Sequence, residues 1–244
     1  MKYNEYTSIV FEQLNRQVKE EEANIRLAAD YCAATVMKDR VIHVFGCGHS
    51  QMFPMELFYR AGGLAQVNAL LVPPYSLNPI AILSTMQERI EGFAGHYLNT
   101  QNVSADDTMI IVSVSGRNAA VIDIAIEAKN IGMKVVVLTS KEFSGSVSSR
   151  HSTGKMLKDY ADVVIDLKCV KGDAALSMEG MPSNFNGTST ILGMTVVNLI
   201  SAQTIENCVN AGYIPPVYVS SNLNEGDQIN ADIIRKYRDK IDCL

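Results

Sequence analysis

The chain has 244 residues, of which 47% are hydrophobic and 19% are charged, and its formal net charge is −5. This many apolar residues can fill the core of one large domain or of two small ones. The negative charge argues against nucleic acid as the main partner, because nucleic-acid binding needs a basic surface. An anionic ligand would therefore be held by local donors.

The cysteines and the chain start indicate the cellular compartment. The five cysteines are scattered, form no C-x-x-C pair and are odd in number, which favours reduced thiols over a disulfide framework or a zinc site. The first residues are polar and lack a signal-peptide core, and no apolar run approaches membrane-spanning length. We expect a cytoplasmic protein with no membrane partner.

Residues 3–38 are expected to be helical. Apolar residues recur there at spacings of three, four and seven, and the acidic run 20–22 lies on the other side. The segment is long for a cap on a single domain, so we expect part of it to cross onto a partner subunit. The alternative, a helix packed on its own sheet, stays equally open.

From residue 41 onward, short apolar strands alternate with helical patterns. The expected strands are 41–45, 65–72, 108–114, 134–139 and 162–167. The expected helices run from the first turn to about 61, then over 80–98, 119–131, 154–160 and 190–211, with a polar loop at 140–153 and an extension at 213–244. This alternation predicts an α/β fold, a parallel sheet covered by helices on both faces, in one domain with helical additions at both ends.

The turn after the third expected strand is the strongest candidate for ligand binding. In an open parallel sheet, ligands bind beyond the carboxyl ends of the strands, so the polar turns should converge there. Ser113, Ser115, Gly116 and Asn118 lie between this strand and a helix that begins at Ala119. The helix start presents unpaired N–H groups and a partial positive charge, which suits the phosphate of a sugar phosphate. A cap needs only one such side chain, so we favour binding over capping alone.

The glycine turn after the first expected strand has two possible roles. Gly46 and Gly48 suggest a dinucleotide site, but the third glycine position holds Gln51, and the second strand ends without a carboxylate. We therefore expect no nicotinamide and no other cofactor. The better interpretation is a tight turn in which the backbone approaches a ligand and Ser50 caps the next helix. A turn and cap without ligand contact is the alternative.

Two further hydroxyl-rich positions could contribute to the same pocket. Thr139 and Ser140 follow the fourth strand and are either ligand contacts or an ordinary loop start. Thr188 and Ser189 precede the last helix. Alone they indicate capping, but beside the 113–118 turn they form a plausible second wall of one pocket.

Carboxylates are the expected catalysts. Glu56 lies among apolar neighbours on the helix after the glycine turn, where a raised pKa would suit a general base and a solvated face is the alternative. Glu88 and Glu91 share one helix face, which is more often a solvated surface.

His49 can reach the ligand from the glycine turn, whereas His43 lies inside a strand and is expected in the core. No histidine pair has metal-site spacing, so we expect no metal.

Taken together, these motifs resemble the sugar isomerase (SIS) domain family. The resemblance rests on the glycine turn 46–50, Ser-x-Ser-Gly-x-Asn at 113–118, the strand 135–139 and Thr-Ser-Thr at 188–190, and it covers about residues 35–212. Segments 150–155, 172–174 and 221–227 look like a separate branch of that family. The resemblance implies a single domain over 1–244, a five-stranded parallel sheet in flavodoxin-like order within a three-layer αβα fold, a homodimer or homotetramer, and phosphosugar binding without a nucleotide.

Members of the family suggest how the site works. Phosphoheptose isomerases use a glutamate near the position of Glu56 and a histidine on the last helix, and this chain has no histidine between residues 190 and 211. N-acetylmuramic acid 6-phosphate etherases are similar at 115–117 and 187–189, with glutamates where Glu56 and either Glu88 or Glu91 lie.

The leading hypothesis is an aldose–ketose phosphosugar isomerase. In it, Glu56 moves a proton between adjacent carbons through an enediolate, and His49 or Glu91 shuttles the hydroxyl proton. A phosphosugar lyase and a non-catalytic phosphosugar sensor are the alternatives.

Overall fold

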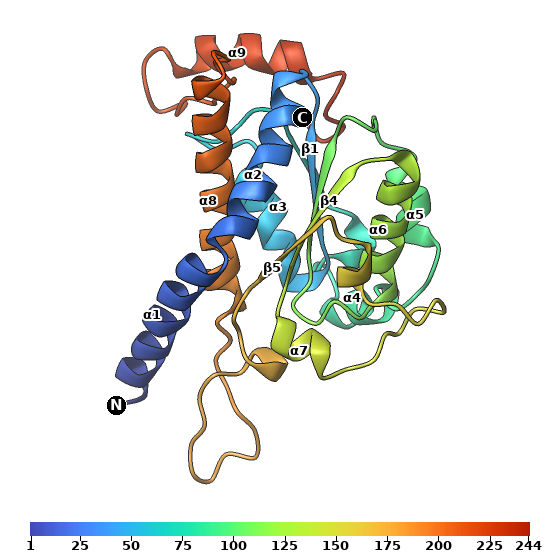
Figure 1. Ribbon diagram of the computed structural model, residues 1–244, viewed down its shortest axis with the longest axis vertical. Coiled ribbons are helices and arrows are strands. Elements are labelled where there is room, and N and C mark those ends of the chain that lie inside the picture. Colours follow the sequence, from blue (N-terminus) through green and yellow to red (C-terminus); the bar gives the residue numbers. More distant parts are fainter.

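The computed structural model describes residues 1–244 and contains a five-stranded, all-parallel sheet between two layers of helices (Figure 1). The strands lie in the order β2-β1-β3-β4-β5. Their bounds are β1 Ile42–Gly46, β2 Val67–Leu70, β3 Thr108–Val112, β4 Lys134–Thr139 and β5 Val163–Asp166. The expected three-layer αβα fold and its flavodoxin-like strand order are confirmed.

Successive residues of each strand pack into two separate hydrophobic cores, one on each face of the sheet. Ile110 and Val112 of β3 pack into a cluster with α2 (Glu22–Met37), α3 (Met52–Leu57) and α8 (Ser189–Asn210). Met109 and Ile111 pack on the other face against α5 (Phe93–Leu98) and α6 (Ala119–Ile131). Because both faces are covered, the strands are apolar throughout instead of alternating with polar residues.

The amino-terminal segment is two helices instead of the single long one expected. The first, α1 (Lys2–Glu20), extends beyond the main body, and α2 lies beside α8 on one face of the sheet (Figure 1). The helices meet at Glu21, a buried carboxylate that lies 3.0 Å from the Lys168 ammonium. This buried ion pair holds the junction between the two helices at Glu21. The sequence around Glu21 contains no glycine or proline that would predict a helix end there.

The helix after the glycine turn is shorter than expected and begins differently. Ser50 lies inside a 3₁₀ turn, Gly48–Gln51, and α3 starts at Met52 without a side-chain cap, so the predicted capping role of Ser50 is wrong. The helix ends at Leu57 because the chain turns sharply there, and Tyr59 has a positive φ of 46°.

The helix expected over 80–98 is divided. A 3₁₀ turn, Pro73–Tyr75, is followed by α4 (Ala81–Gln87), and α5 begins only at Phe93. Two hydrogen bonds with α6 stabilise the break between α4 and α5. The N–H of Ala120 donates to the Glu88 carbonyl at 3.0 Å, and the Gly92 N–H donates to the Asp123 carboxylate at 2.7 Å.

The segment between β4 and β5 also differs from its prediction. The expected polar loop 140–153 contains a short helix, α7 (Lys141–Gly145), capped by the Ser140 hydroxyl. The helix expected at 154–160 is a 3₁₀ turn, Leu157–Tyr160. After β5 come another 3₁₀ turn, Lys171–Asp173, and an extended excursion closed by the Leu176–Phe185 bridge. This excursion extends beyond the body together with α1 (Figure 1).

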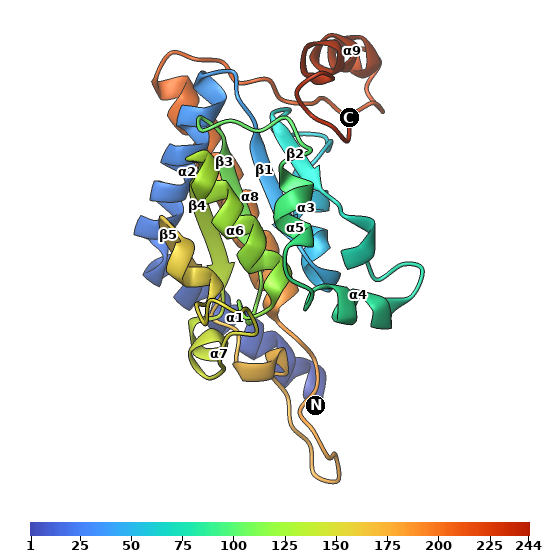
Figure 2. The same ribbon diagram turned by 90° about the vertical axis from the view of Figure 1, so that its right-hand side faces the viewer.

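The carboxyl-terminal extension packs at the amino ends of the strands. It carries α9 (Gly226–Tyr237), and Tyr218, Tyr237 and Ile241 form a third apolar cluster with Val41, the residue before β1. Figure 2 shows α9 at the end of the molecule away from α4 and α7. No helix of the structure combines the length and the apolar character that a membrane span requires.

Candidate functional site

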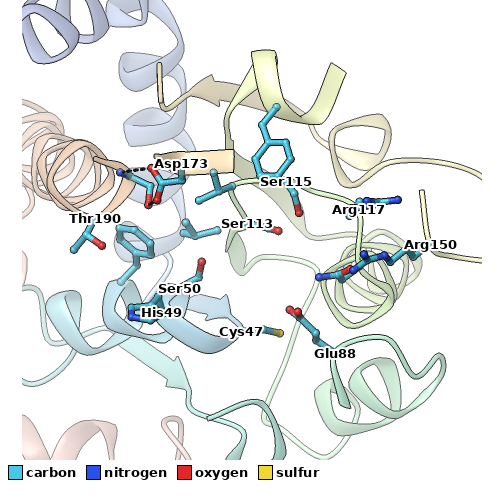
Figure 3. A pocket seen from close by; sticks show the side chains of 16 residues that line it. Cys47, His49, Ser50, Glu88, Ser113, Ser115, Arg117, Arg150, Asp173 and Thr190 are labelled. Carbon is cyan, nitrogen blue, oxygen red and sulfur yellow. Dashed lines mark hydrogen bonds between the residues drawn. The ribbon is translucent and has the colours of Figure 1, made fainter. Parts of the chain in front are cut away.

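A cavity of about 360 Å³ lies at the carboxyl ends of β1 and β3 (Figure 3). It is lined by residues of the glycine turn, the turn after β3, the α4–α5 break, the loop after α7 and the entrance of α8. The lining residues are Cys47, His49, Ser50, Phe53, Glu88, Val112, Ser113, Val114, Ser115, Arg117, Asn118, Phe143, Arg150, Asp173, Ser189 and Thr190. The cavity is therefore where an open parallel sheet is expected to bind its ligand.

Besides Glu88, the structure brings six of the residues singled out from the sequence into this one cavity. They are His49, Ser50, Ser113, Ser115, Asn118 and Ser189. The strand ends lie level, with Gly46 of β1 paired with Val112 of β3, so the turns that follow these two strands face the same space.

The glycines of both turns shape the cavity without lining it. A β-carbon on Gly46 would collide with the backbone of Ser50, and Gly48 has a positive φ of 58°. Gly116 also has a positive φ, 60°, and its N–H donates to the Ser113 hydroxyl at 3.2 Å. These positions need glycine to form the tight turns.

Three predicted hydroxyl contacts lie outside the cavity, and two of them bond within the fold instead. Thr139 Oγ1 donates to the Val114 carbonyl at 3.1 Å. Ser140 Oγ donates to the Cys169 carbonyl at 2.6 Å and accepts from the Phe143 N–H at 3.1 Å. Thr188 is the N-cap residue of α8 and is almost fully buried, and its hydroxyl makes no hydrogen bond. The structure does not bring these side chains to the ligand space.

Two of the proposed catalytic carboxylates also lie outside the cavity lining. Glu56 pairs with Arg60 and accepts a 2.8 Å hydrogen bond from the Asn198 amide. Glu91 accepts hydrogen bonds from the hydroxyl and the N–H of Ser152, and these bonds lower its pKa.

Glu88 is the glutamate that the cavity contains. It caps the end of α4, and the break before α5 turns it toward the sheet. Burial raises its pKa, while a hydrogen bond from Asn118 and the charges of Arg89 and Arg150 oppose the rise. Burial, and secondly the charge of Glu88, raise the pKa of the neighbouring Cys47 thiol, which therefore stays protonated at neutral pH. The sequence pairs Glu88 with Glu91 but gives no sign of the helix break that separates them.

Two arginines line the cavity, and both were missed in the sequence because they lie in irregular segments. Arg150 Nη1 donates to Asn118 Oδ1 at 2.9 Å, and Arg117 Nε donates to the Ser148 carbonyl at 2.9 Å. Figure 3 shows Arg150 and Glu88 on the side of the pocket away from Asp173 and Thr190. Burial, together with the nearby charges of Arg117 and Arg89, lowers the pKa of Arg150. A bound anion would offset the repulsion between these positively charged groups.

Two helix N-termini face the cavity, and only one of them is capped by a side chain of the protein itself. Asp173 Oδ1 accepts from the N–H groups of Thr188 and Ser189 at 3.0 Å, and Oδ2 accepts from the Ser189 hydroxyl, so this carboxylate fills the start of α8 (Figure 3). At the start of α6, by contrast, the Asn118 side chain makes no capping hydrogen bond, and the Ala120 N–H donates to the main-chain carbonyl of Glu88 at 3.0 Å. The α6 N-terminus is thus the position where an external anion fits.

The structure contains no cluster of side chains that is a candidate for metal binding. No group of three or more His, Cys, Asp or Glu side chains is arranged to hold a metal ion. His43, expected in the core, is fully buried and bonds to Asp107 at 3.3 Å, and the five cysteines are unpaired.

Comparison with known proteins gives matches over nearly the whole chain. Residues 5–140 match the model of the SIS domain. A UPF0309 protein of Geobacillus sp. (strain WCH70) is 40% identical over 239 residues, covering 98% of this chain and 97% of that protein. A UPF0309 protein of Listeria innocua is 38% identical over 241 residues, covering 99% and 98%.

Solved structures share the fold at low sequence identity. A phosphoheptose isomerase from Francisella tularensis has a TM-score of 0.53 at 15% identity, covering 83% of this chain and 96% of that one. The Vibrio vulnificus NanR protein complexed with ManNAc-6P has a TM-score of 0.54 at 14% identity, covering 96% and 69%.

Proposed function

Because this chain belongs to the SIS domain family, we propose that it binds a phosphorylated sugar in the 360 Å³ cavity and interconverts its aldose and ketose forms. The volume lies within the range of small-molecule pockets, which is about 300–1,000 Å³. The lining combines hydroxyls, guanidinium groups and the half-buried carboxylates of Glu88 and Asp173, so binding and proton transfer both have candidate groups.

The observation that carries the proposal is the N-terminus of α6, which no side chain caps. Asp173 already neutralises the start of α8, whereas no side chain caps the start of α6. Ser113 and Ser115 add hydroxyl donors at this point, and Arg150 adds a positive charge close by. A phosphate there would receive main-chain, hydroxyl and charge-assisted hydrogen bonds together.

Glu88 is the general base in the proposed mechanism, in place of Glu56. A carboxylate with a raised pKa can remove the proton from C2 of an aldose phosphate and return it to C1, through an enediolate intermediate. His49 lies at the cavity and can move the proton between the two sugar oxygens, while Glu91 lies outside it. The Arg150 charge stabilises the enediolate electrostatically.

A second candidate function is phosphosugar sensing without turnover. The NanR protein was solved with ManNAc-6P and shares this fold, and α8 of this chain carries no histidine. A phosphosugar lyase, in which proton removal by Glu88 is followed by loss of a neighbouring substituent, is the alternative reaction at the same site.

A panel of sugar phosphates tests the proposal. Aldose and ketose phosphates of five to seven carbons should raise the melting temperature, and the same sugars without phosphate should not. For each ligand that binds, NMR in D₂O detects deuterium entering C1 or C2, which reports proton abstraction directly. Binding without deuterium entry would favour the sensor, and loss of a substituent would identify the lyase.

Glu88→Gln and Glu56→Gln form a matched pair that identifies the base. Glu88→Gln should bind the sugar phosphate and incorporate no deuterium, whereas Glu56→Gln should retain exchange. The reverse result would return the catalytic role to Glu56.

We also propose that the chain is a homo-oligomer. The outer face of α1 exposes Tyr3 (66%), Phe11 (62%) and Val18 (45%), which a second copy could cover. Phe11→Glu should lower the mass measured by light scattering, and Gln228→Glu at an exposed position of α9 should not. A monomeric unmodified protein would contradict this proposal.

A further inference from the structure

The loop of residues 146–156, here called the Arg150 loop, carries Arg150 into the cavity. It lies between α7 and the 3₁₀ turn Leu157–Tyr160. Main-chain hydrogen bonds join it to the turn after β3, from the Arg150 N–H to the Arg117 carbonyl at 2.8 Å and from Leu157 N–H to Gly116 at 2.9 Å. The remaining loop has no regular secondary structure of its own to hold it.

Two carboxylates outside the cavity hold this loop. Glu91 Oε1 accepts from the Ser152 N–H at 2.7 Å, and Oε2 accepts from the Ser152 hydroxyl at 2.6 Å. Asp123 Oδ1 lies 3.1 Å from His151 Nε2. The side chains of His151 and Asp123 are only 6% and 8% exposed, so this second contact is shielded from water.

The hydrogen bonds also define the state of the His151 ring. The Thr153 N–H donates to Nδ1 at 3.1 Å, so Nδ1 is the acceptor and Nε2 carries the proton that faces Asp123. The sequence of contacts Thr153–His151–Asp123 is reminiscent of a hydrolytic triad. However, the hydroxyl of Thr153, 2.9 Å from Nδ1, shares that nitrogen with the main-chain N–H, and none of the three residues lines the cavity.

Both contacts connect the Arg150 loop to the segment that carries Glu88. Glu91 belongs to the break between α4 and α5, and Asp123 Oδ2 accepts from Gly92 in the same break. We infer that Glu91, Asp123 and His151 are positioning residues, which hold Arg150 against Asn118 and thereby orient the Glu88 carboxylate. The inference deepens the proposed function, because it assigns these residues to the same phosphosugar site.

The connection from Arg150 to Glu88 passes through the Asn118 amide. Arginine can only donate, so the amide must direct Oδ1 toward Arg150, and its NH₂ group is then the donor through which Asn118 lowers the pKa of Glu88. Without Arg150 in place, the amide is free to turn over. Glu88 would then lose the Asn118 donor and the nearby charge of Arg150. Because both groups lower the pKa of Glu88, their loss would raise it further.

We call the contacts of Glu91 and Asp123 with the Arg150 loop the clamp. A double-mutant cycle tests whether this clamp affects ligand binding through Arg150. Glu91→Ala should lower the affinity for fructose 6-phosphate, or for another sugar phosphate that the panel identifies, by about tenfold. In an Arg150→Gln background, the same change should have little further effect. Glu91→Gln should restore most of the affinity, because its amide can accept from the Ser152 N–H and donate to the hydroxyl. Additive losses in the cycle would overturn the inference.

Glu127→Ala is the matched control. Glu127 accepts hydrogen bonds from Asn99 and Asn130 and joins α5 to α6 without touching the Arg150 loop. Its removal should leave sugar phosphate affinity unchanged at similar thermal stability. An equal loss for Glu127→Ala and Glu91→Ala would show a general effect of stability and overturn the inference.

Hydrogen exchange separates this inference from the proposed function, since it needs no ligand. In Glu91→Ala, the amide protons of residues 151–153 should exchange at least about tenfold faster, while those of α6 stay protected. If no sugar phosphate binds the unmodified protein, the proposed function fails and this measurement still decides whether the clamp exists. Unchanged exchange in the loop would refute it.

Discussion

The side-chain oxygen of Asn118 accepts a 2.9 Å hydrogen bond from the guanidinium of Arg150, 32 residues further along the chain. This contact uses the oxygen that would otherwise cap α6. Asn118 is therefore a link between Arg150 and Glu88, and the helix start beside it stays open to an anion.

Asn118→Asp should separate folding from binding. The new carboxylate keeps the contact with Arg150 and suits the N-terminus of a helix, and these gains offset its repulsion by Glu88, so thermal stability should change little. It also repels both Glu88 and a bound phosphate, and sugar phosphate affinity should fall by about 30-fold or more. Calorimetric titration measures the loss. Asn15→Asp on α1 adds the same charge away from the cavity and serves as the control, and equal affinities of these two variants would place the phosphate elsewhere.

Ser115→Ala should weaken every phosphorylated ligand by a similar factor. Loss of one hydrogen bond to a charged group costs about 1.5–3 kcal/mol, or about 10- to 150-fold in affinity. Ser140→Ala is the matched control, because Ser140 caps α7 outside the cavity. It should lower the unfolding free energy by about 1 kcal/mol and leave affinity unchanged. If Ser140→Ala reduced binding as much as Ser115→Ala, the assignment of the phosphate to the α6 start would fail.

Glu88→Gln should abolish turnover and raise thermal stability at neutral pH. The folded-state pKa of Glu88 is raised, chiefly by burial, so the folded protein holds this proton more tightly than the unfolded chain does. Stability is therefore lost as pH rises from the ordinary glutamate pKa, about 4.3, through the raised value. Glutamine is neutral at every pH and avoids this loss. Melting curves at pH 4 and pH 7 should show the variant's advantage only at pH 7.

The same titration should appear in the reaction rate. A general base must be ionised, so kcat/KM should rise with pH through a value above the ordinary range for glutamate. A rate independent of pH between 4 and 7 would be inconsistent with Glu88 as the base.

The sequence predicts the sheet and the phosphate turn because both depend on local patterns. Apolar runs such as 108–112 mark strands buried on both faces, and short polar residues at 113–118 mark a strand-to-helix turn. Strand ends that lie level then bring Ser50 and Ser113 to one cavity, as expected from the topology alone.

The remaining site residues depend on long-range contacts that no local pattern reveals. Glu88 reaches the cavity because Ala120 and Asp123 of α6 hold the break after α4. Arg150 lies in a loop that distant carboxylates hold, and Asp173 closes the start of a helix that begins 16 residues later. Glu56 illustrates the opposite case, since its apolar neighbours suggested a buried base, and the structure pairs it with Arg60 instead.

Asp107→Ala should destabilise the fold without affecting the cavity. The Asp107 side chain is fully buried beside the start of β1, where it accepts two hydrogen bonds from Arg40, one from the Val41 N–H and one from the Ser104 N–H. Removing one partner of a buried ion pair costs about 3–5 kcal/mol, measurable by urea unfolding at pH 7. Asp106→Ala is the adjacent control. Its contact with Lys38 is exposed and should be worth less than about 1 kcal/mol.

The pH dependence of the Asp107 effect follows from its environment. Burial alone would raise the pKa of Asp107, but hydrogen bonds from His43, Arg40 and the Val41 N–H outweigh it and lower the pKa. The stabilisation is therefore complete above the ordinary aspartate pKa, about 3.9, and is lost as pH falls through the lower folded-state value. Unfolding free energies of the unmodified protein and Asp107→Ala should differ most at pH 7 and converge in strong acid. A difference that stayed constant down to pH 2 would mean that packing, and not the charge, holds this corner of the sheet.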